Sequence, residues 1–141
     1  MKYVLDSSVA LKWVLPEPLS QKARRLRDDY QKKIHELLAP EVFPAEVAHA
    51  LTRAERKKLI PVGHAAGFLA DIMQTAPTLH PYIPLLLRAV DISSHLRIGS
   101  YDCLYVALAE REKCELVTAD EKMVKALQGT FPFIVSLASL P

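Results

Sequence analysis

The chain has 141 residues, half of them hydrophobic and 24% charged, with a net charge of +2. This length predicts a single domain over residues 1–141, and the composition excludes a disordered chain. The charge balance excludes a polybasic tail, and two cysteines are too few for a disulfide-stabilised scaffold. No apolar run is long enough to cross a membrane, so we expect a cytoplasmic protein without membrane contact.

The predicted elements alternate between short strands and longer helices. Apolar runs indicate strands, apolar residues spaced three or four apart indicate helices, and Pro, Gly or capping residues separate them. In chain order the patterns predict strand 3–5, helix 9–15, helix 17–38 with a competing strand at 37–39, helix 44–59, helix 64–74, strand 78–80, helix 83–97, helix 101–113, strand 115–118, a helix from Asp120 to Leu127, and strand 133–135. This alternation favours an α/β fold with a parallel, helix-covered sheet.

Four acidic residues lie where predicted strands end or predicted helices begin. Asp6 directly follows the first strand, and Asp120 follows strand 115–118 after one intervening residue. Glu46 and Asp102 lie in the first turns of two helices. Because active sites of parallel α/β sheets lie beyond the carboxyl ends of the strands, these side chains can gather at one edge. The alternative is that each acid only caps a helix or complements its dipole.

The surroundings of these acids favour a metal site. Asp6 follows Tyr3-Val4-Leu5 and Asp102 precedes an apolar run, and a carboxylate in apolar surroundings needs a partner. Four gathered carboxylates repel one another unless a cation is present, and oxygen ligands favour Mg²⁺ or Mn²⁺ over zinc. Such a site can activate water for phosphodiester cleavage. A zinc-protease pattern beginning at His35-Glu36 is broken by Ala39.

Four segments of the chain carry a family resemblance. They are Tyr3-Val4-Leu5-Asp6-Ser7-Ser8, Pro44-Ala45-Glu46-Val47, the run from Tyr101 to Ala109, and Thr118-Ala119-Asp120-Glu121-Lys122. Together they resemble the PIN-domain family over the whole chain, and within it the VapC-type toxins of toxin–antitoxin pairs. The resemblance implies a three-layer α/β/α fold with a short-stranded, mostly parallel central sheet. It also implies a hydrolase: an endoribonuclease that depends on Mg²⁺ or Mn²⁺ and uses a metal-activated water.

The resemblance further implies roles for individual residues and partners. The four acids Asp6, Glu46, Asp102 and Asp120 are expected to be catalytic and to hold one or two metal ions, with Asp6 and Asp102 as the principal ligands. Three hydroxyl residues, Ser7, Ser8 and Thr118, are expected to orient ligands or water from outside the ligand set. The implied partners are an RNA substrate, a cognate antitoxin protein and a second copy of the chain.

Basic residues follow Glu46 along its predicted helix. Residues 1–60 carry 12 Lys and Arg against 8 Asp and Glu, whereas residues 61–141 carry 6 against 8. Arg53 and Lys57 lie 7 and 11 residues after Glu46 and so share its helix face, and Lys122 closely follows Asp120. We expect these three to contact RNA phosphates. The alternative is a solvated helix end whose cations complement the dipole.

Two other function classes compete with the ribonuclease interpretation. Another Mg²⁺-dependent phosphoryl-transfer enzyme is the first, but a phosphatase with an Asp6 nucleophile needs a second Asp where the chain has Ser8. A phospho-receiver needs adjacent acids after the first strand, where the chain has Ser7 and Ser8. The second is a non-catalytic RNA- or protein-binding PIN module, against which the four intact acids argue.

Overall fold

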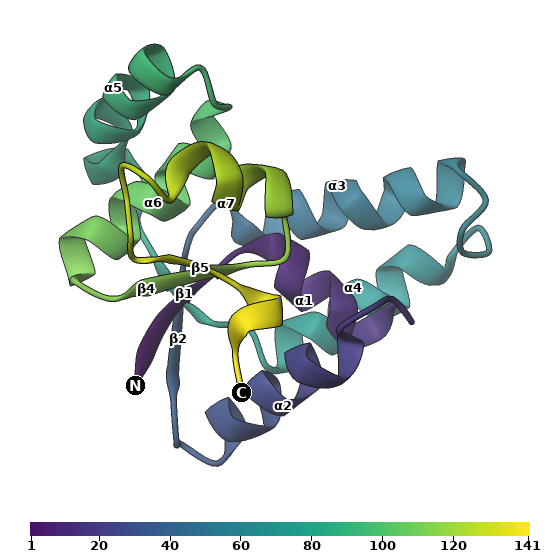
Figure 1. Ribbon diagram of the computed structural model, residues 1–141. Helices are drawn as coiled ribbons and strands as arrows, with labels where there is room; N and C mark the ends of the chain where they lie inside the picture. Colours follow the sequence, from purple (N-terminus) through teal and green to yellow (C-terminus); the bar gives the residue numbers. More distant parts are fainter.

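A five-stranded parallel sheet forms the centre of the computed structural model, which describes all residues from Met1 to Pro141 (Figure 1). The strands are β1 (Lys2–Leu5), β2 (Glu36–Pro40), β3 (Thr78–His80), β4 (Glu115–Thr118) and β5 (Ile134–Ser136). Their order is β3-β2-β1-β4-β5, with every neighbouring pair parallel. The central strands are apolar and buried, because helices cover both faces of the sheet.

Helices occupy two layers, one on each face of the sheet (Figure 1). They are α1 (Ser7–Val14), α2 (Ser20–Gln31), α3 (Phe43–Arg56), α4 (His64–Gln74), α5 (Leu86–Leu96), α6 (Ser100–Glu112) and α7 (Glu121–Leu127), with short 3₁₀ helices at Ile83–Leu85 and Leu137–Ser139. Helices α1 to α4 pack together on one side, and α5 to α7 lie on the other. Right-handed crossovers produce this division, because the chain winds outward from β1 in two opposite directions. The expected three-layer α/β/α fold is confirmed, and the sheet is parallel throughout.

Helix α6 lies at the centre of the core. Seven consecutive residues, Cys103 to Ala109, are buried, because α6 contacts β1, β2 and β4 on one side and α5 on the other. These residues belong to a single cluster of 34 buried apolar residues. Its first turn, with Asp102, therefore emerges from the core directly at one edge of the sheet.

The helix predicted over 17–38 is wrong at its C-terminal end. Helix α2 ends at Gln31, the backbone of Lys33 adopts a left-handed φ of 62°, and β2 begins at Glu36. Leu37 and Leu38 continue a three-to-four spacing by coincidence, since they pair with Tyr3 and Val4 as a buried strand. The competing strand at 37–39 is thus the correct prediction. None of the seven helices combines the length and hydropathy that a bilayer crossing requires.

The point where the winding direction reverses lies between β1 and β4. The chain leaves β1 toward β2 and β3, returns to β4 on the other side of β1, and continues to β5. In parallel sheets the strand ends at such a reversal leave a crevice, because the connecting segments diverge to opposite faces. Asp6 follows β1 and Asp120 follows β4, so this edge is where the predicted site residues meet.

Candidate active site

Asp6 is the buried centre of the acidic site. Its backbone N–H donates to the carbonyl of Val117 (3.0 Å), which ties the end of β1 to β4. The residue is only 5% exposed. Both the Ser8 hydroxyl (2.5 Å) and the Thr118 hydroxyl (2.9 Å) donate to its Oδ2. Since both donors use the same oxygen, Oδ1 receives no side-chain hydrogen bond.

The two hydroxyls also fix the loop after β4. The Ser8 hydroxyl accepts a hydrogen bond from the Ala119 N–H (3.0 Å), and the Thr118 hydroxyl accepts one from the Asp120 N–H (3.0 Å). The same side chains therefore hold the Asp6 carboxylate and the backbone that carries Asp120. Ser7, the third predicted hydroxyl residue, bonds to no carboxylate and faces Tyr105 instead.

The pKa values of three site acids are raised. Burial is the main cause for Asp6, partly offset by the Ser8 and Thr118 hydroxyls and reinforced by Asp120. For Glu46, burial and the charges of Asp6 and Asp102 raise the pKa to about 7, although Tyr105 opposes the rise. For Asp102, burial and the charges of Asp6 and Asp120 raise the pKa to about 6. Each of the four acids raises the pKa of another or has its own pKa raised by another, so the four form one electrostatic cluster.

Asp120 differs from the other three acids because it is exposed and caps a helix. Its Oδ1 accepts hydrogen bonds from the backbone N–H groups of Lys122 (3.0 Å) and Met123 (3.2 Å) at the start of α7. The capping role that competed with a metal role is therefore real for this residue. It does not exclude the other role, because Oδ2 accepts no hydrogen bond and the charge raises the pKa of both Asp6 and Asp102.

No positive side chain neutralises the cluster. None of the ion pairs in the structure involves Asp6, Glu46, Asp102 or Asp120. Oε1 of Glu46 is buried without any hydrogen-bond partner. Nevertheless, no three His, Cys, Asp or Glu side chains lie together as a ready-made ion-binding group. The acids share one neighbourhood, but they are spaced more loosely than the ligands of a bound ion.

One residue of this neighbourhood has no sequence motif that marks its role. Tyr105 is fully buried in α6, three residues after Asp102, and its hydroxyl faces Glu46 and Ser7. Burial and the neighbouring acids raise the pKa of Tyr105 far above its usual range. From the sequence alone it is one of several apolar positions in a buried helix. The only available signal is the spacing of three from Asp102, which places both on one helix face.

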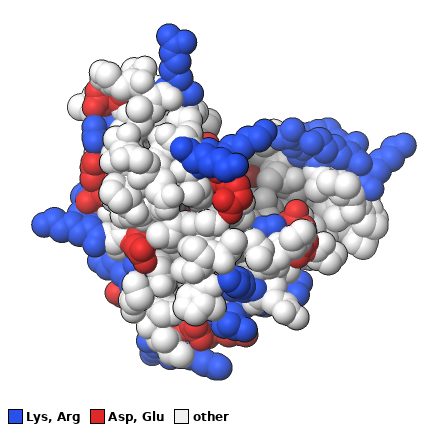
Figure 2. All heavy atoms as spheres, in the orientation of Figure 1, with Lys and Arg blue, Asp and Glu red and all other residues white.

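The predicted RNA-binding residues lie on or beside an arm of the molecule. Helices α3 and α4 pack against each other as a hairpin that projects from the body (Figure 1). Figure 2 shows Lys and Arg side chains gathered along this arm, with acidic side chains near the body. Arg53 and Lys57 are exposed and form no ion pair, and the same holds for Lys122 beside Asp120. Lys57 lies just past the end of α3.

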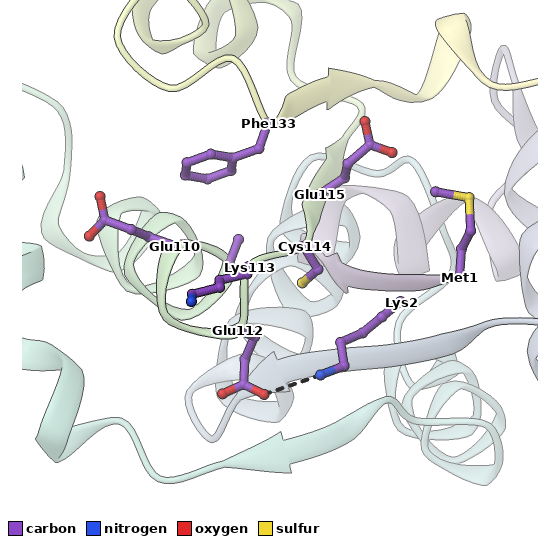
Figure 3. A pocket seen from close by; sticks show the side chains of 9 residues that line it. Met1, Lys2, Glu110, Glu112, Lys113, Cys114, Glu115 and Phe133 are labelled. Atoms are coloured by element: carbon purple, nitrogen blue, oxygen red, sulfur yellow. Dashed lines mark hydrogen bonds and ion pairs between the residues drawn. The ribbon is translucent and has the colours of Figure 1, made fainter.

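A large open pocket of about 670 Å³ lies at the opposite edge of the sheet (Figure 3). Residues at the amino ends of β1 and β4 and the last turn of α6 line it, including Lys2, Glu110, Glu112 and Glu115. Here Lys2 pairs with Glu112 at 3.5 Å. This pocket shares no residue with the acidic site, which lies at the carboxyl ends of the strands.

The sequence comparison decides the family. A model of the PIN domain matches residues 3–127. The chain belongs to the PIN-domain family. Ribonuclease VapC9 of Mycobacterium tuberculosis is 30% identical to this PIN-domain chain over 132 residues, which cover 94% of the chain and 96% of that protein. Ribonuclease VapC3 of Pyrobaculum aerophilum is 29% identical over 138 residues, covering 96% and 99%. The predicted membership of the VapC-type toxin ribonucleases is therefore confirmed.

Solved structures show the same fold for this PIN-domain chain. PAE2754 from Pyrobaculum aerophilum superposes with a TM-score of 0.70 at 17% identity, covering 99% of this chain and 94% of that one. VapBC2 from Rickettsia felis, bound to a DNA fragment from its promoter, gives 0.65 at 16% identity, covering 96% and 97%. At these identities the likeness confirms the architecture, while the residue roles depend on the geometry above.

Proposed function

We propose that this VapC-type chain cleaves RNA with Mg²⁺ or Mn²⁺ held by Asp6, Glu46, Asp102 and Asp120. The observation that carries the proposal is the electrostatics of the cluster. Burial and mutual repulsion raise the pKa values of three of these carboxylates, and no protein cation is paired with any of the four. A divalent cation removes this repulsion and supplies the missing partner.

The donor set fits a hard cation. All four side chains offer carboxylate oxygens, and Oε1 of Glu46 and Oδ1 of Asp6 are free of side-chain hydrogen bonds. Mg²⁺ is commonly bound by few carboxylates and keeps several waters, so a loosely spaced set suits it better than a closed zinc-type cage. We assign Asp6 and Asp102 as principal ligands, because each of them interacts with both of the other two acids. Their charges raise the pKa of Glu46, and the charge of Asp120 raises theirs.

The residues around the ligands have separate tasks. When bound, one or two such ions provide a nucleophilic water near neutral pH and stabilise the leaving oxygen of the phosphodiester. The Ser8 and Thr118 hydroxyls hold Oδ2 of Asp6, and Oδ1, which has no side-chain donor, would be the oxygen that can serve as a ligand. The capping bonds to Asp120 similarly fix its Oδ1 and leave Oδ2 available.

The substrate is proposed to lie along the basic arm. Arg53 and Lys57 on the arm and Lys122 beside Asp120 are exposed cations that form no ion pair. Such cations attract the phosphate groups of RNA. Next to the carboxylates, a divalent cation is needed to offset the repulsion between the phosphates and the acids. A single-stranded or looped RNA fits best, because its backbone can bend into the crevice at the strand ends.

The proposed partners are an antitoxin and a second copy of the chain. The solved structures that share the fold include VapBC2 and FitAB, each bound to DNA. A second copy has a suitable surface in Ile83, Leu87 and Val90, which lie four and three residues apart along the 3₁₀ turn and α5 and are all exposed. Leu87 is 88% exposed. We expect Leu87→Glu to convert a dimer into a monomer, as measured by light scattering.

The direct test is cleavage of a labelled single-stranded RNA by the purified chain with and without metal. We expect cleavage with Mg²⁺ or Mn²⁺, none in EDTA, and recovery when Mg²⁺ is added back. Cleavage that persists in EDTA would contradict the metal mechanism. RNA binding that is equally tight with and without metal, and never followed by cleavage, would favour a non-catalytic binding module.

A further inference from the structure

The side chain of Tyr105 has a polar group that packing does not require. The residue is completely buried in α6, and it is the largest side chain in the fully buried core. A phenylalanine fills almost the same volume without a hydroxyl, and a buried hydroxyl without a partner costs free energy. In this structure the Tyr105 hydroxyl forms no hydrogen bond with another protein group. Packing of the core alone therefore does not explain a tyrosine at this position.

Glu46 lies beside this hydroxyl and has an unpaired acceptor. Oε1 of Glu46 is also buried and also lacks a hydrogen-bond partner. The two groups are close enough that each changes the pKa of the other, and Ser7 and Asp6 also act on the Tyr105 hydroxyl. A phenol is a donor near neutral pH and a carboxylate is an acceptor. A hydrogen bond from the Tyr105 hydroxyl to Oε1 of Glu46 would therefore satisfy both groups at once.

The positions of the two residues connect this pair to the acidic cluster. Tyr105 lies one helical turn beyond Asp102, and Glu46 is acted on by both Asp6 and Asp102. We propose that Tyr105 is a positioning residue whose hydroxyl donates to Glu46 and holds that carboxylate toward the metal site. This inference rests on the proposed metal-dependent function. It adds a residue outside the four acids, anchored in the central helix of the core.

The test measures binding of Mn²⁺ alone to the full chain, by electron paramagnetic resonance or calorimetry. Groups that hydrogen-bond to a metal ligand typically contribute about 10–100-fold to metal affinity, and we expect Tyr105→Phe to weaken Mn²⁺ binding by that amount. The fold should survive, since only one oxygen is removed; thermal unfolding without metal checks this. Tyr30→Phe is the matched control, because the Tyr30 hydroxyl bonds to the carbonyl of Ala76 at 2.9 Å, away from the site.

A double-mutant cycle distinguishes positioning from a general structural effect. If Tyr105 acts through Glu46, Tyr105→Phe should change Mn²⁺ affinity less than about twofold in a Glu46→Gln background. Glu46→Asp offers a second background that withdraws the carboxylate from the hydroxyl while Tyr105 stays intact, and Tyr105→Phe should again add little. Full additivity in both backgrounds, or unchanged affinity of Tyr105→Phe, would overturn the inference.

The same experiment separates this inference from the proposed function. If the wild type binds Mn²⁺ and Asp6→Asn does not, the metal site stands and Tyr105→Phe alone decides the positioning role. If the wild type binds no Mn²⁺, the metal site fails and the role of Tyr105 fails with it.

Discussion

The two edges of the sheet place acidic residues in opposite electrostatic settings. At the amino edge, Glu110 and Glu112 line the open pocket (Figure 3). Both are paired with cations. Arg88 lies 2.8 Å from Glu110, and its hydrogen bond lowers the pKa of that carboxyl. Burial acts in the opposite direction on Glu112, but hydrogen bonds from Arg111 and Lys2 outweigh it and lower its pKa.

At the carboxyl edge the acids have no such partners. Asp6, Glu46 and Asp102 are more buried than the amino-edge acids and have raised pKa values. Both edges carry acidic residues, and the differences are the deeper burial at the carboxyl edge, which is the main cause of the raised pKa values, and the absence of a protein cation there. The charge of a paired acid is neutralised by a cation of the protein, whereas a cluster of unpaired, buried acids needs a cation from solution. This contrast supports the metal site that we propose at the carboxyl edge, whereas the larger pocket at the amino edge is lined by paired acids.

The largest expected effect is the loss of cleavage when a carboxyl-edge acid is neutralised. We expect Asp6→Asn or Asp102→Asn to reduce RNA cleavage by more than the roughly 100-fold that loss of an outer hydrogen-bond partner can cost. The amide introduced by Asp6→Asn retains an oxygen that can accept from Ser8 and Thr118, so the variant should fold. The matched amino-edge variant, Glu112→Gln, should cleave like the wild type. Both variants are measured with the same labelled RNA. Equal losses of cleavage at both edges would contradict the proposal that only the carboxyl-edge acids take part in cleavage.

The next effect is stabilisation by metal. An ion that binds only the folded chain at 100 times its Kd adds about 2.7 kcal/mol to the free energy of unfolding. For a chain of this size that corresponds to a rise in Tm of roughly 5–10 °C. We expect this rise in Tm when Mg²⁺ is added to the wild type or to Glu112→Gln, as measured by differential scanning calorimetry. Asp6→Asn should show none, and a rise as large as that of the wild type would place the ion elsewhere.

A smaller effect is the pH dependence of stability without metal. Glu46 and Asp102 have folded-state pKa values of about 7 and about 6, above those of an unfolded chain, so the folded state binds more protons between about pH 4 and pH 7. Stability should therefore fall as pH rises through this window. Glu46→Gln should flatten the part near pH 7, and saturating Mg²⁺ should remove the fall. The lowered pKa values of Glu110 and Glu112 act in the opposite sense and only at lower pH.

The smallest effect concerns the basic arm. Arg53→Ala and Lys57→Ala should each weaken RNA binding several-fold and reduce the slope of log K against log salt by about one. Cleavage at saturating RNA should change little, because neither side chain belongs to the acidic cluster. Lys32→Ala is the matched control: it removes an exposed lysine just before β2, at the amino edge. A loss in Lys32→Ala equal to that in Arg53→Ala would show that only net charge matters.

Local sequence patterns predicted where the site residues stand along the chain. Asp6 follows an apolar strand and Asp120 begins a helix, and both features depend on neighbours within a few residues. The alternation of strands and helices then implied a parallel sheet, whose strand ends must share an edge. These inferences succeeded because turn chemistry, capping and chain winding follow local rules. The helix predicted over 17–38 failed where the local rule was ambiguous, since only pairing with β1 makes Leu37 and Leu38 a strand.

The tertiary structure decided what the site acids lack. Whether an acid has a cation beside it depends on residues far away in the chain: Arg88 reaches Glu110 across 22 positions, whereas nothing reaches Oε1 of Glu46. The orphaned hydroxyl of Tyr105 is likewise visible only in the folded chain, where α6 and the first turn of α3 bring Tyr105 and Glu46 near each other. Burial and charge pairing are sums over neighbours in space. The sequence therefore determined which residues could form a metal site, and only the fold determined that they are left without a partner.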